Sequence, residues 1–378
     1  MKVSALQDNF AKGLSVVGRA VPARSTLPQA SHVKIETDEG RLKLVATDLM
    51  IATTCWIGAQ VEEDGAVTVP ARLLTDFITS LPSDRIELSV PARGRQLHIQ
   101  CARNEATMSG MDAADFPPVP AVADGLALTL DPKTLRKAIS QVQFAAASDD
   151  TRPVLTGVHT LAEGRELTLA AADGFRLAVH TLQLKQDVPE KVEVIIPARA
   201  LREIERLITD ESEEVEMAIN GARSQVMFKL PDVEVVATLI QGTFPNYGQL
   251  IPQPYATRTI IEMRQFLQET RIAAIFARDG AGIVRVQLEP GEGENAGKMT
   301  VSARAEEIGE HRGDIDVKIE GDASKIAFNS RYLQDVLQAL DDVSEVALET
   351  TSPSSPGVIR PIGNDRYVHV VMPMFVQW

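Results

Sequence analysis

The chain has 378 residues and a formal net charge of −14, and only 2 residues are cysteines. This length exceeds what one hydrophobic core of ordinary size organises, so several domains are expected. An apolar content of 44% with a charged content of 24% is typical of a soluble globular protein, and the low cysteine count favours a reducing cytoplasm over a disulfide scaffold. The apolar runs are too short to cross a bilayer, and the first residues lack a signal-peptide core. The acidic balance, taken alone, argues against nucleic acid as a partner.

The first third of the chain is predicted to contain two helices and several strands. Residues 1–20 are predicted to be helical, because apolar residues recur at helical steps, at Leu6, Phe10, Leu14 and Val17. Residues 32–57 alternate apolar and polar side chains around a hairpin turn at residues 38–40. The other elements predicted here are a strand and helix over 67–81, strands at 85–90 and 96–101, and a linker at 112–124.

The rest of the chain repeats this order of elements. Asp131 as N-cap and Pro132 at the first helical position begin one helix, and another lies near residues 263–277. Strands are predicted at residues 157–160, 167–181, 215–219, 226–230, 233–240, 284–288, 299–303 and 366–372, with a second proline-rich linker at 244–254.

One stretch occurs three times, at residues 67–72, 194–199 and 326–331. Each copy is a strand that runs into a helix with an arginine in its first turn. Pro70 and Pro197 suit a first helical position, and Asn329 suits a side-chain N-cap. Large apolar residues then follow at steps that share one helical face, namely Leu74, Phe77 and Leu81; Leu201, Ile204 and Ile208; Leu333, Val336 and Leu340.

The spacing of these copies predicts three units of about 126 residues, which together fill the chain. The predicted domains are residues 1–124, 125–252 and 253–378. Each unit reads as helix, strands, helix, strands, so the fold class is α+β, with two helices packed on one face of a mostly antiparallel sheet.

Charge is unevenly distributed between helices and strands. Six predicted helical segments with their adjoining turns carry +5 together, so the remainder of the chain carries −19. A basic helical layer could bind phosphates without reading bases, and acidic strands would discourage DNA from binding elsewhere. Ordinary solvated helix faces account for the same charges, so charge alone leaves both interpretations open.

Motifs for catalysis are lacking in the sequence. No phosphate-binding loop, serine elbow or zinc-binding helix motif occurs, and the histidines have no metal-ligand spacing. Asp48 and Asp173 occupy equivalent places in two units and could suggest acid–base chemistry. A repeated turn with a hydrogen-bonded aspartate explains them more simply. We therefore expect a protein that is not an enzyme and needs no cofactor or metal.

Short motifs spread over the whole chain carry a family resemblance. They are Ala46-Thr-Asp48, Val69-Pro-Ala-Arg72, Ala113-Ala-Asp-Phe-Pro117, Ala172-Asp-Gly-Phe-Arg-Leu-Ala178, Gly242-Thr-Phe-Pro-Asn-Tyr247, Phe328-Asn329 with Tyr332-Leu333, and Val370-Val-Met-Pro-Met374. Together they resemble the bacterial DNA sliding clamps, the beta subunit of DNA polymerase III. The resemblance implies a head-to-tail homodimer that closes into a six-domain ring, with helices lining a central hole.

A ring of this kind would enclose duplex DNA without sequence preference and tether the replicative polymerase, a clamp loader and other partners. By resemblance, Arg24, Arg72 and Arg199 would face DNA. Their positions on the predicted helices add Lys12, Arg136 and Lys137 to this set. The subunit interface would pair Met108 of the first domain with Ile275 and Phe276 of the third.

The family also implies an apolar pocket that takes a short extended peptide from each partner. Carried over by motif, its residues are Leu155, Ala172, Gly174, Phe175, Arg176, Leu177, Pro245, Leu250, Asn329, Tyr332, Val370, Val371, Met372, Pro373 and Met374. Gly248-Gln249 replaces the basic rim residue common in the family. The chain ends in Phe375-Val-Gln-Trp378 where a basic residue and a leucine are usual. A peptide-binding scaffold that does not encircle DNA is the alternative function, and the net charge of −14 motivates it.

Overall fold

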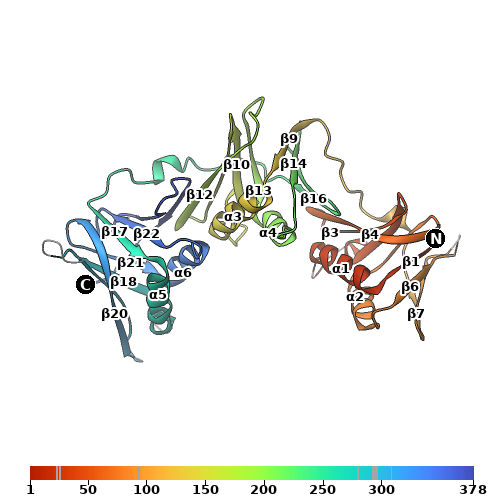
Figure 1. Ribbon diagram of the computed structural model, residues 1–378, viewed down its shortest axis with the longest axis horizontal. Helices are drawn as coiled ribbons and strands as arrows, with labels where there is room; N and C mark the ends of the chain where they lie inside the picture. Colours follow the sequence, from red (N-terminus) through yellow and green to blue (C-terminus); the bar gives the residue numbers. More distant parts are fainter. Residues whose placement is uncertain (23, 25–26, 92–93, 279–280, 292–296, 308) are drawn as a thin grey trace. The chain divides into compact units, whose positions relative to one another are not determined.

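The computed structural model describes residues 1–378 except residues 23, 25–26, 92–93, 279–280, 292–296 and 308 (Figure 1). One order of elements recurs three times: a strand, a helix, four strands, a second helix and three strands. The first repeat comprises β1 (Lys2–Leu6), α1 (Gln7–Val17), β2 (His32–Asp38), β3 (Arg41–Thr47), β4 (Ile51–Glu63), β5 (Ala66–Pro70), α2 (Ala71–Ser80), β6 (Arg85–Ser89), β7 (Gln96–Cys101) and β8 (Asn104–Ser109).

The second and third repeats follow the same plan. The second comprises β9 (Gly125–Leu130), α3 (Pro132–Val142), β10 (Gly157–Glu163), β11 (Glu166–Ala172), β12 (Arg176–Gln183), β13 (Val192–Pro197), α4 (Ala198–Leu207), β14 (Val215–Asn220), β15 (Gln225–Leu230) and β16 (Val233–Thr238). The third comprises β17 (Thr257–Glu262), α5 (Met263–Arg278), β18 (Ile283–Glu289), β19 (Gly297–Ala305), β20 (Gly309–Gly321), β21 (Ser324–Asn329), α6 (Ser330–Ala339), β22 (Glu345–Thr350), β23 (Gly357–Pro361) and β24 (Tyr367–Val371).

The chain divides into two compact units, and the second repeat contributes to both. One unit contains Met1–Lys133 and Arg199–Leu239, and the other contains Thr134–Ala198 and Ile240–Trp378. Each unit holds one 12-stranded sheet, whose described strand pairs are all antiparallel. The α+β class with antiparallel sheets is therefore confirmed.

Strands of successive repeats pair directly with each other. In the first unit β4 is long enough to pair with two strands along its length, with β16 at Ile51–Cys55 and with β1 at Ala59–Glu63. In the second unit β12 pairs with β24, and Leu177 lies opposite Val370. Each sheet thus continues from one repeat into the next.

The helices cover one face of each sheet with the predicted apolar stripes. In Figure 1, α1 lies beside α2 and α5 lies beside α6. The stripe residues Leu74, Leu201, Ile204, Leu333 and Val336 are at most 1% exposed, as predicted. Phe77 is only partly buried, because its neighbour Ile78 takes the core position in α2.

Two predicted elements at the start and middle of the chain are wrong. Lys2–Leu6 form a strand rather than the first turn of a helix, because both edges of this segment are paired, with β4 and with β6. Leu6, counted in the helical stripe, is 59% exposed. The single strand expected over 167–181 is two strands, β11 and β12, separated by a turn in which Gly174 has φ +94°.

The turns at the starts of the helices agree with the sequence in most respects. Asn329 caps α6 by accepting hydrogen bonds from the backbone N–H groups of Arg331 and Tyr332. Pro132 is the first residue of α3, as predicted. Pro70, in contrast, is the extended residue before α2 and ends β5.

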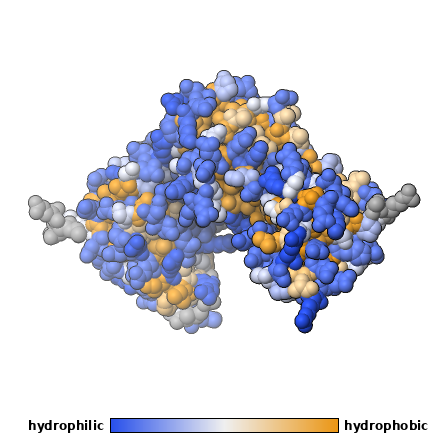
Figure 2. Space-filling view, turned by 45° about the vertical axis from the view of Figure 1, so that its right-hand side comes forward, coloured by the Kyte–Doolittle hydropathy of each residue, from blue (hydrophilic) through white to orange (hydrophobic). Residues whose placement is uncertain are grey.

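The surface seen in Figure 2 is mostly hydrophilic, with apolar residues in small separate groups. None of the helices in the described part of the chain is both long and apolar enough to cross a membrane. Among the described residues, no group of three or more His, Cys, Asp or Glu side chains could hold a metal ion.

Candidate functional site

The residues predicted to bind a partner peptide lie around the paired strands β12 and β24. The apolar cluster beneath them contains Leu155, Ala172, Leu177 and Val370, and Phe244 packs into the same cluster. The backbone N–H of Met372 donates to the carbonyl of Phe175 at 2.8 Å, which extends the β12–β24 pairing past the last strand. Pocket segments far apart in the sequence are thereby brought together.

The pocket residues divide into a buried floor and an exposed rim. Leu155, Ala172, Leu177 and Val370 are each at most 8% exposed and form the floor, while Val371 is also buried but lies outside this cluster. The apolar side chains of the rim are Phe175, 58% exposed, Leu250, 53%, and Met372, 43%. Pro245 is also exposed, while Pro373 and Met374 are half-buried. Exposed apolar side chains above an apolar floor are what a site for an extended peptide requires.

A tight turn places Phe175 at the rim. The Oδ1 atom of Asp173 accepts from the backbone N–H groups of Phe175 at 2.8 Å and Arg176 at 3.0 Å. Gly174 adopts its positive φ at the centre of this turn, and a Cβ there would lie 2.8 Å from Nη1 of Arg152. The turn therefore requires both the aspartate and the glycine.

Arg176 fixes this turn against the third repeat. Its Nε donates to Asp173 at 3.0 Å, its Nη1 to Asp335 of α6 at 2.6 Å and its Nη2 to the carbonyl of Phe144 at 2.7 Å. The guanidinium lies 4.5 Å from the ring centroid of Tyr332, on which Phe175 also stacks. Because Arg176 is only 9% exposed and each of its three guanidinium nitrogens already donates a hydrogen bond, it supports the pocket rather than contacting a ligand through its charge.

Two buried histidines lie in this region, and the sequence alone did not indicate their role. His369 of β24 stacks on Phe144 and shares a hydrogen bond with Tyr367 at 3.2 Å, and burial lowers its pKa to about 3. Burial and the nearby Lys137 lower the pKa of His180 to about 4, and its Nδ1 lies 2.8 Å from Gln141. Both imidazoles are therefore neutral at physiological pH. In the sequence, only their places at inward-facing positions of β12 and β24 could have indicated that these histidines are buried.

The predicted DNA-facing residues differ in their surroundings. Lys12, Arg24 and Arg72 of the first repeat are exposed. Arg72 and Arg19 line a surface cavity of about 560 Å³ between α1 and α2. Arg199 is ion-paired with Asp48, and Lys137 is ion-paired with Asp342. Arg136 is exposed on α3.

Asp48 and Asp173, the possible acid–base pair, both serve as turn residues. Asp48 accepts from the backbone N–H groups of Met50 at 3.0 Å and Ile51 at 2.8 Å, as Asp173 does in its own turn. Each carboxylate also binds an arginine, Arg199 or Arg176. The simpler interpretation, a repeated turn with a hydrogen-bonded aspartate, is the one that the geometry supports.

The residues expected at the subunit interface also differ from one another. Met108 of β8 is 5% exposed and belongs to the core of the first repeat, so its side chain is not available at a surface. Ile275 of α5 is 57% exposed. Phe276 stacks on His311 of β20 with ring centroids 5.9 Å apart.

Comparisons with known proteins agree along the whole chain. Residues 1–120, 129–246 and 248–375 match the N-terminal, central and C-terminal domains of the DNA polymerase III beta subunit. The beta sliding clamp of Staphylococcus aureus (strain Mu50) is 32% identical over 383 residues, covering 99% of each chain. The DNA polymerase sliding clamp of Bacillus subtilis superposes with a TM-score of 0.93 at 27% identity, and the DNA polymerase III subunit beta of Pseudomonas aeruginosa with 0.91 at 27%, each covering 100% of both chains.

The fold and these matches define a non-catalytic protein built of three clamp domains. The chain belongs to the DNA polymerase III beta subunit family, the bacterial beta sliding clamps.

Proposed function

We propose that this chain is the DNA sliding clamp and processivity factor of its DNA polymerase III, and that two copies close head to tail into a ring around duplex DNA. The ring holds the polymerase at the primer end by enclosure, so no bond is made or broken and no sequence is read. The full-length family match supports this function. The observation that carries ring closure is the repeated pairing between repeats.

Two junctions between repeats use equivalent strands. The last strand of one repeat, β16 or β24, pairs with the third strand after the first helix of the preceding repeat, β4 or β12. The strands left over are β8 and β20. Among the described residues, β8 pairs only with β7, and the first half of β20 pairs only with β19. A β8–β20 junction between two chains uses both free edges, and two such junctions close a dimer.

The register of this third junction follows from the other two. Val233 lies opposite Cys55, and Tyr367 lies opposite His180. The equivalent positions are Asn104 in β8 and Gly313 in β20. Glu105 then faces Arg312 of the partner copy, so opposite charges meet across the junction.

Native mass and charge reversal test this assembly. Light scattering should give about twice the chain mass of 41.1 kDa. Glu105→Arg or Arg312→Glu alone should shift the dimer toward monomer, and the double variant should recover dimer. Single variants that remain fully dimeric would contradict the β8–β20 junction.

The exposed basic residues of the first repeat, Lys12, Arg24 and Arg72, are the strongest DNA-facing candidates. Arg199 and Lys137 are already ion-paired with Asp48 and Asp342. Each can therefore contact a phosphate only by dividing its hydrogen bonds between the phosphate and that carboxylate. Cross-linked dimers loaded on DNA test enclosure, because a closed ring stays on a circle but slides off a linear duplex. Equal loss from both forms would overturn the proposal.

We also propose that the pocket around β12 and β24 binds an extended peptide of the polymerase, the loader and other partners. The apolar floor accepts leucine or phenylalanine side chains, and Met372 adapts to varied sequences. Removing residues 372–378 should abolish peptide binding and leave the dimer intact.

A peptide-binding scaffold that does not enclose DNA is the second candidate, because the net charge of −14 opposes DNA binding in general. Peptide binding without preferential retention on circular DNA would favour it.

A further inference from the structure

The chain leaves the last strand of each repeat in the same way. After β8, β16 and β24 the chain passes next to another strand of the same repeat, β5, β13 or β21. There a backbone N–H of the passing segment donates to a backbone carbonyl of that strand. Met111 donates to Thr68 of β5 at 2.9 Å, Ile240 to Ile195 of β13 at 2.9 Å, and Met374 to Ala327 of β21 at 2.8 Å. These residues occupy equivalent positions in the three repeats.

In the first two repeats an aromatic side chain follows this hydrogen bond and covers the outer face of the sheet. Phe116 comes five residues after Met111, is 7% exposed and shares a cavity lining with Lys34 of β2. Phe244 comes four residues after Ile240, is 7% exposed and packs on His159 of β10 at 5.3 Å. In both cases the chain then continues into the linker to the next repeat.

The third repeat ends four residues after Met374, at Trp378. The Nζ atom of Lys325 lies 5.2 Å from the centroid of the Trp378 ring. Arg285 of β18, at the position of His159 in β10, donates to the carbonyl of Gln377 at 3.4 Å. Trp378 therefore takes the place in the third repeat that Phe116 and Phe244 take in the first and second.

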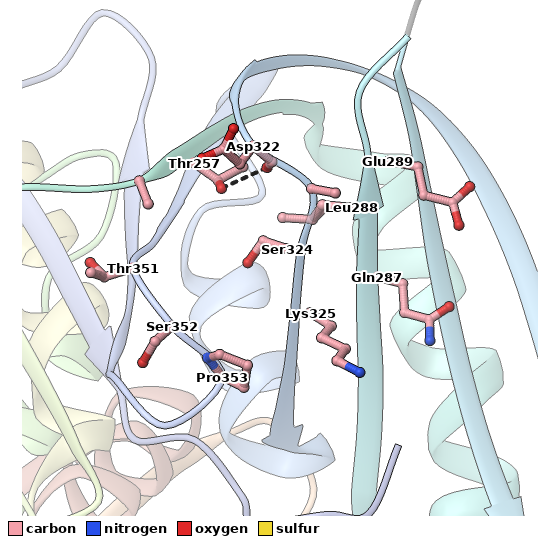
Figure 3. Close-up of a pocket in the computed structure, with 12 residues that line it drawn as sticks. Thr257, Gln287, Leu288, Glu289, Asp322, Ser324, Lys325, Thr351, Ser352 and Pro353 are labelled. Atoms are coloured by element: carbon pink, nitrogen blue, oxygen red, sulfur yellow. Dashed lines mark hydrogen bonds between the residues drawn. The ribbon is translucent and has the colours of Figure 1, made fainter.

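The surface beside Lys325 is polar and carries charges of both signs, because Glu289 and Asp322 line the same cavity. Lys325 and Gln287 lie opposite each other on β21 and β18, and Figure 3 shows both side chains beside the same cavity, of about 530 Å³. The attraction between a cation and an aromatic ring is stronger for the indole of tryptophan than for a smaller ring. Because this contact is exposed, the attraction is modest. The match to the family's C-terminal domain ends at residue 375, so Trp378 lies outside the matched residues.

Between its two ends the tail supplies a wall of the peptide site. Met372 is bound to Phe175 on one side and Met374 to Ala327 on the other. We propose that Trp378, held by Lys325, acts as a latch that positions Met372–Met374 for binding of an extended partner peptide. Trp378 is thus a positioning residue, and this inference rests on the peptide-binding function proposed above.

Phe375 offers a matched control within the same tail. It is 86% exposed and is also aromatic, but it does not occupy the anchoring position. With a fluorescein-labelled eight-residue peptide ending in Leu-Phe as the probe, Trp378→Ala should raise the Kd about fivefold, and Phe375→Ala should change it less than twofold. Lys325→Ala should resemble Trp378→Ala, while Trp378→Phe should recover most of the affinity.

Native mass and thermal midpoint should not change in these variants, because Trp378 is 41% exposed and lies outside the core. The contact itself has a spectroscopic signature. Trp56→Phe leaves Trp378 as the single tryptophan, whose emission should shift when Lys325 is replaced by Met and when the peptide binds.

The outcomes separate this inference from the proposed function. A native protein that fails to bind the peptide would overturn peptide binding and the latch with it. Normal peptide binding in Trp378→Ala would overturn only the latch. An equal loss in Phe375→Ala would mean that the tail acts through its exposed aromatic surface, and the latch would also be wrong.

Discussion

The guanidinium of Arg199, in the first turn of α4, is ion-paired with the carboxylate of Asp48, in the turn before β4. The same arginine donates to the carbonyl of Arg19 at 3.5 Å. At the other junction Arg176 binds Asp173 and the carbonyl of Phe144. Each turn aspartate is thus bound by an arginine that also donates to a carbonyl of a helical segment. Arg199 comes from the repeat after Asp48, whereas Arg176 belongs to the same repeat as Asp173 and reaches the third repeat through Asp335.

Replacing Arg199 should affect stability more than replacing Arg72. The Arg199 side chain is 51% exposed, so Arg199→Ala should lower the free energy of unfolding by about 1 kcal/mol or less. Arg72 is exposed, and Arg72→Ala should leave stability unchanged while it weakens DNA binding and reduces its salt dependence. Urea denaturation and DNA titrations at several salt concentrations measure the two effects. A stability loss in Arg72→Ala that matches that of Arg199→Ala would contradict this assignment.

Arg176→Met should destabilise the second unit strongly. The substitution leaves Asp173 and Asp335 without their shared cation in a largely buried place, which costs about 3–5 kcal/mol. Peptide binding should fall as well, because the turn that presents Phe175 loses its support. Arg152→Ala is the control, since Arg152 is exposed and donates a single described hydrogen bond, to the carbonyl of Asp173. A loss of less than 1 kcal/mol for Arg176→Met would show that the network adapts.

Stability should fall as the pH drops from about 6.5 toward 4. Burial holds the pKa of His369 at about 3 and that of His180 at about 4, against 6.5 for an ordinary histidine. In this window the unfolded chain binds protons that the folded chain does not. The free energy of unfolding therefore falls by up to about 1.4 kcal/mol for each histidine per unit drop in pH. Urea midpoints across this range measure the slope. His369→Gln should reduce this slope by an amount that corresponds to at most one bound proton. An unchanged slope would contradict a buried, neutral His369 as a source of the pH dependence.

Gly174→Ala should cost about 1–2 kcal/mol, because its φ of +94° strains an alanine and the new Cβ would meet Arg152. Gly18→Ala is the control, with φ −58° and open space around its Cβ position. Thermal unfolding compares the two, and similar shifts in Tm would argue against a strained turn.

Helix starts were predictable from the sequence, and several strands were not. Proline or asparagine before Arg72, Arg199 and Arg331, with apolar residues at helical steps behind them, indicated all three helices. In contrast, neither β20 nor β8 was predicted. The first half of β20 and most of β8 are polar, and the apolar alternation of β20 is confined to Ile315, Val317 and Ile319.

The pocket could be predicted as a set of motifs but not as a set of contacts. Asp335, which binds Arg176, is 159 residues away along the chain, and no local pattern links the two. Met108 was expected at a subunit surface and proved to be a core residue, because the alternation of β8 turns its side chain inward.

The direct pairing of β4 with β16 has a consequence for the segment between residues 112 and 124. A protease that cuts this connection removes a covalent bond but leaves five consecutive strand positions, Ile51–Cys55, hydrogen-bonded across the junction. The cleaved pieces should therefore stay together on a sizing column in native buffer and separate only in denaturant. Continuity of the sheet, more than continuity of the polypeptide, holds the first repeat to the second.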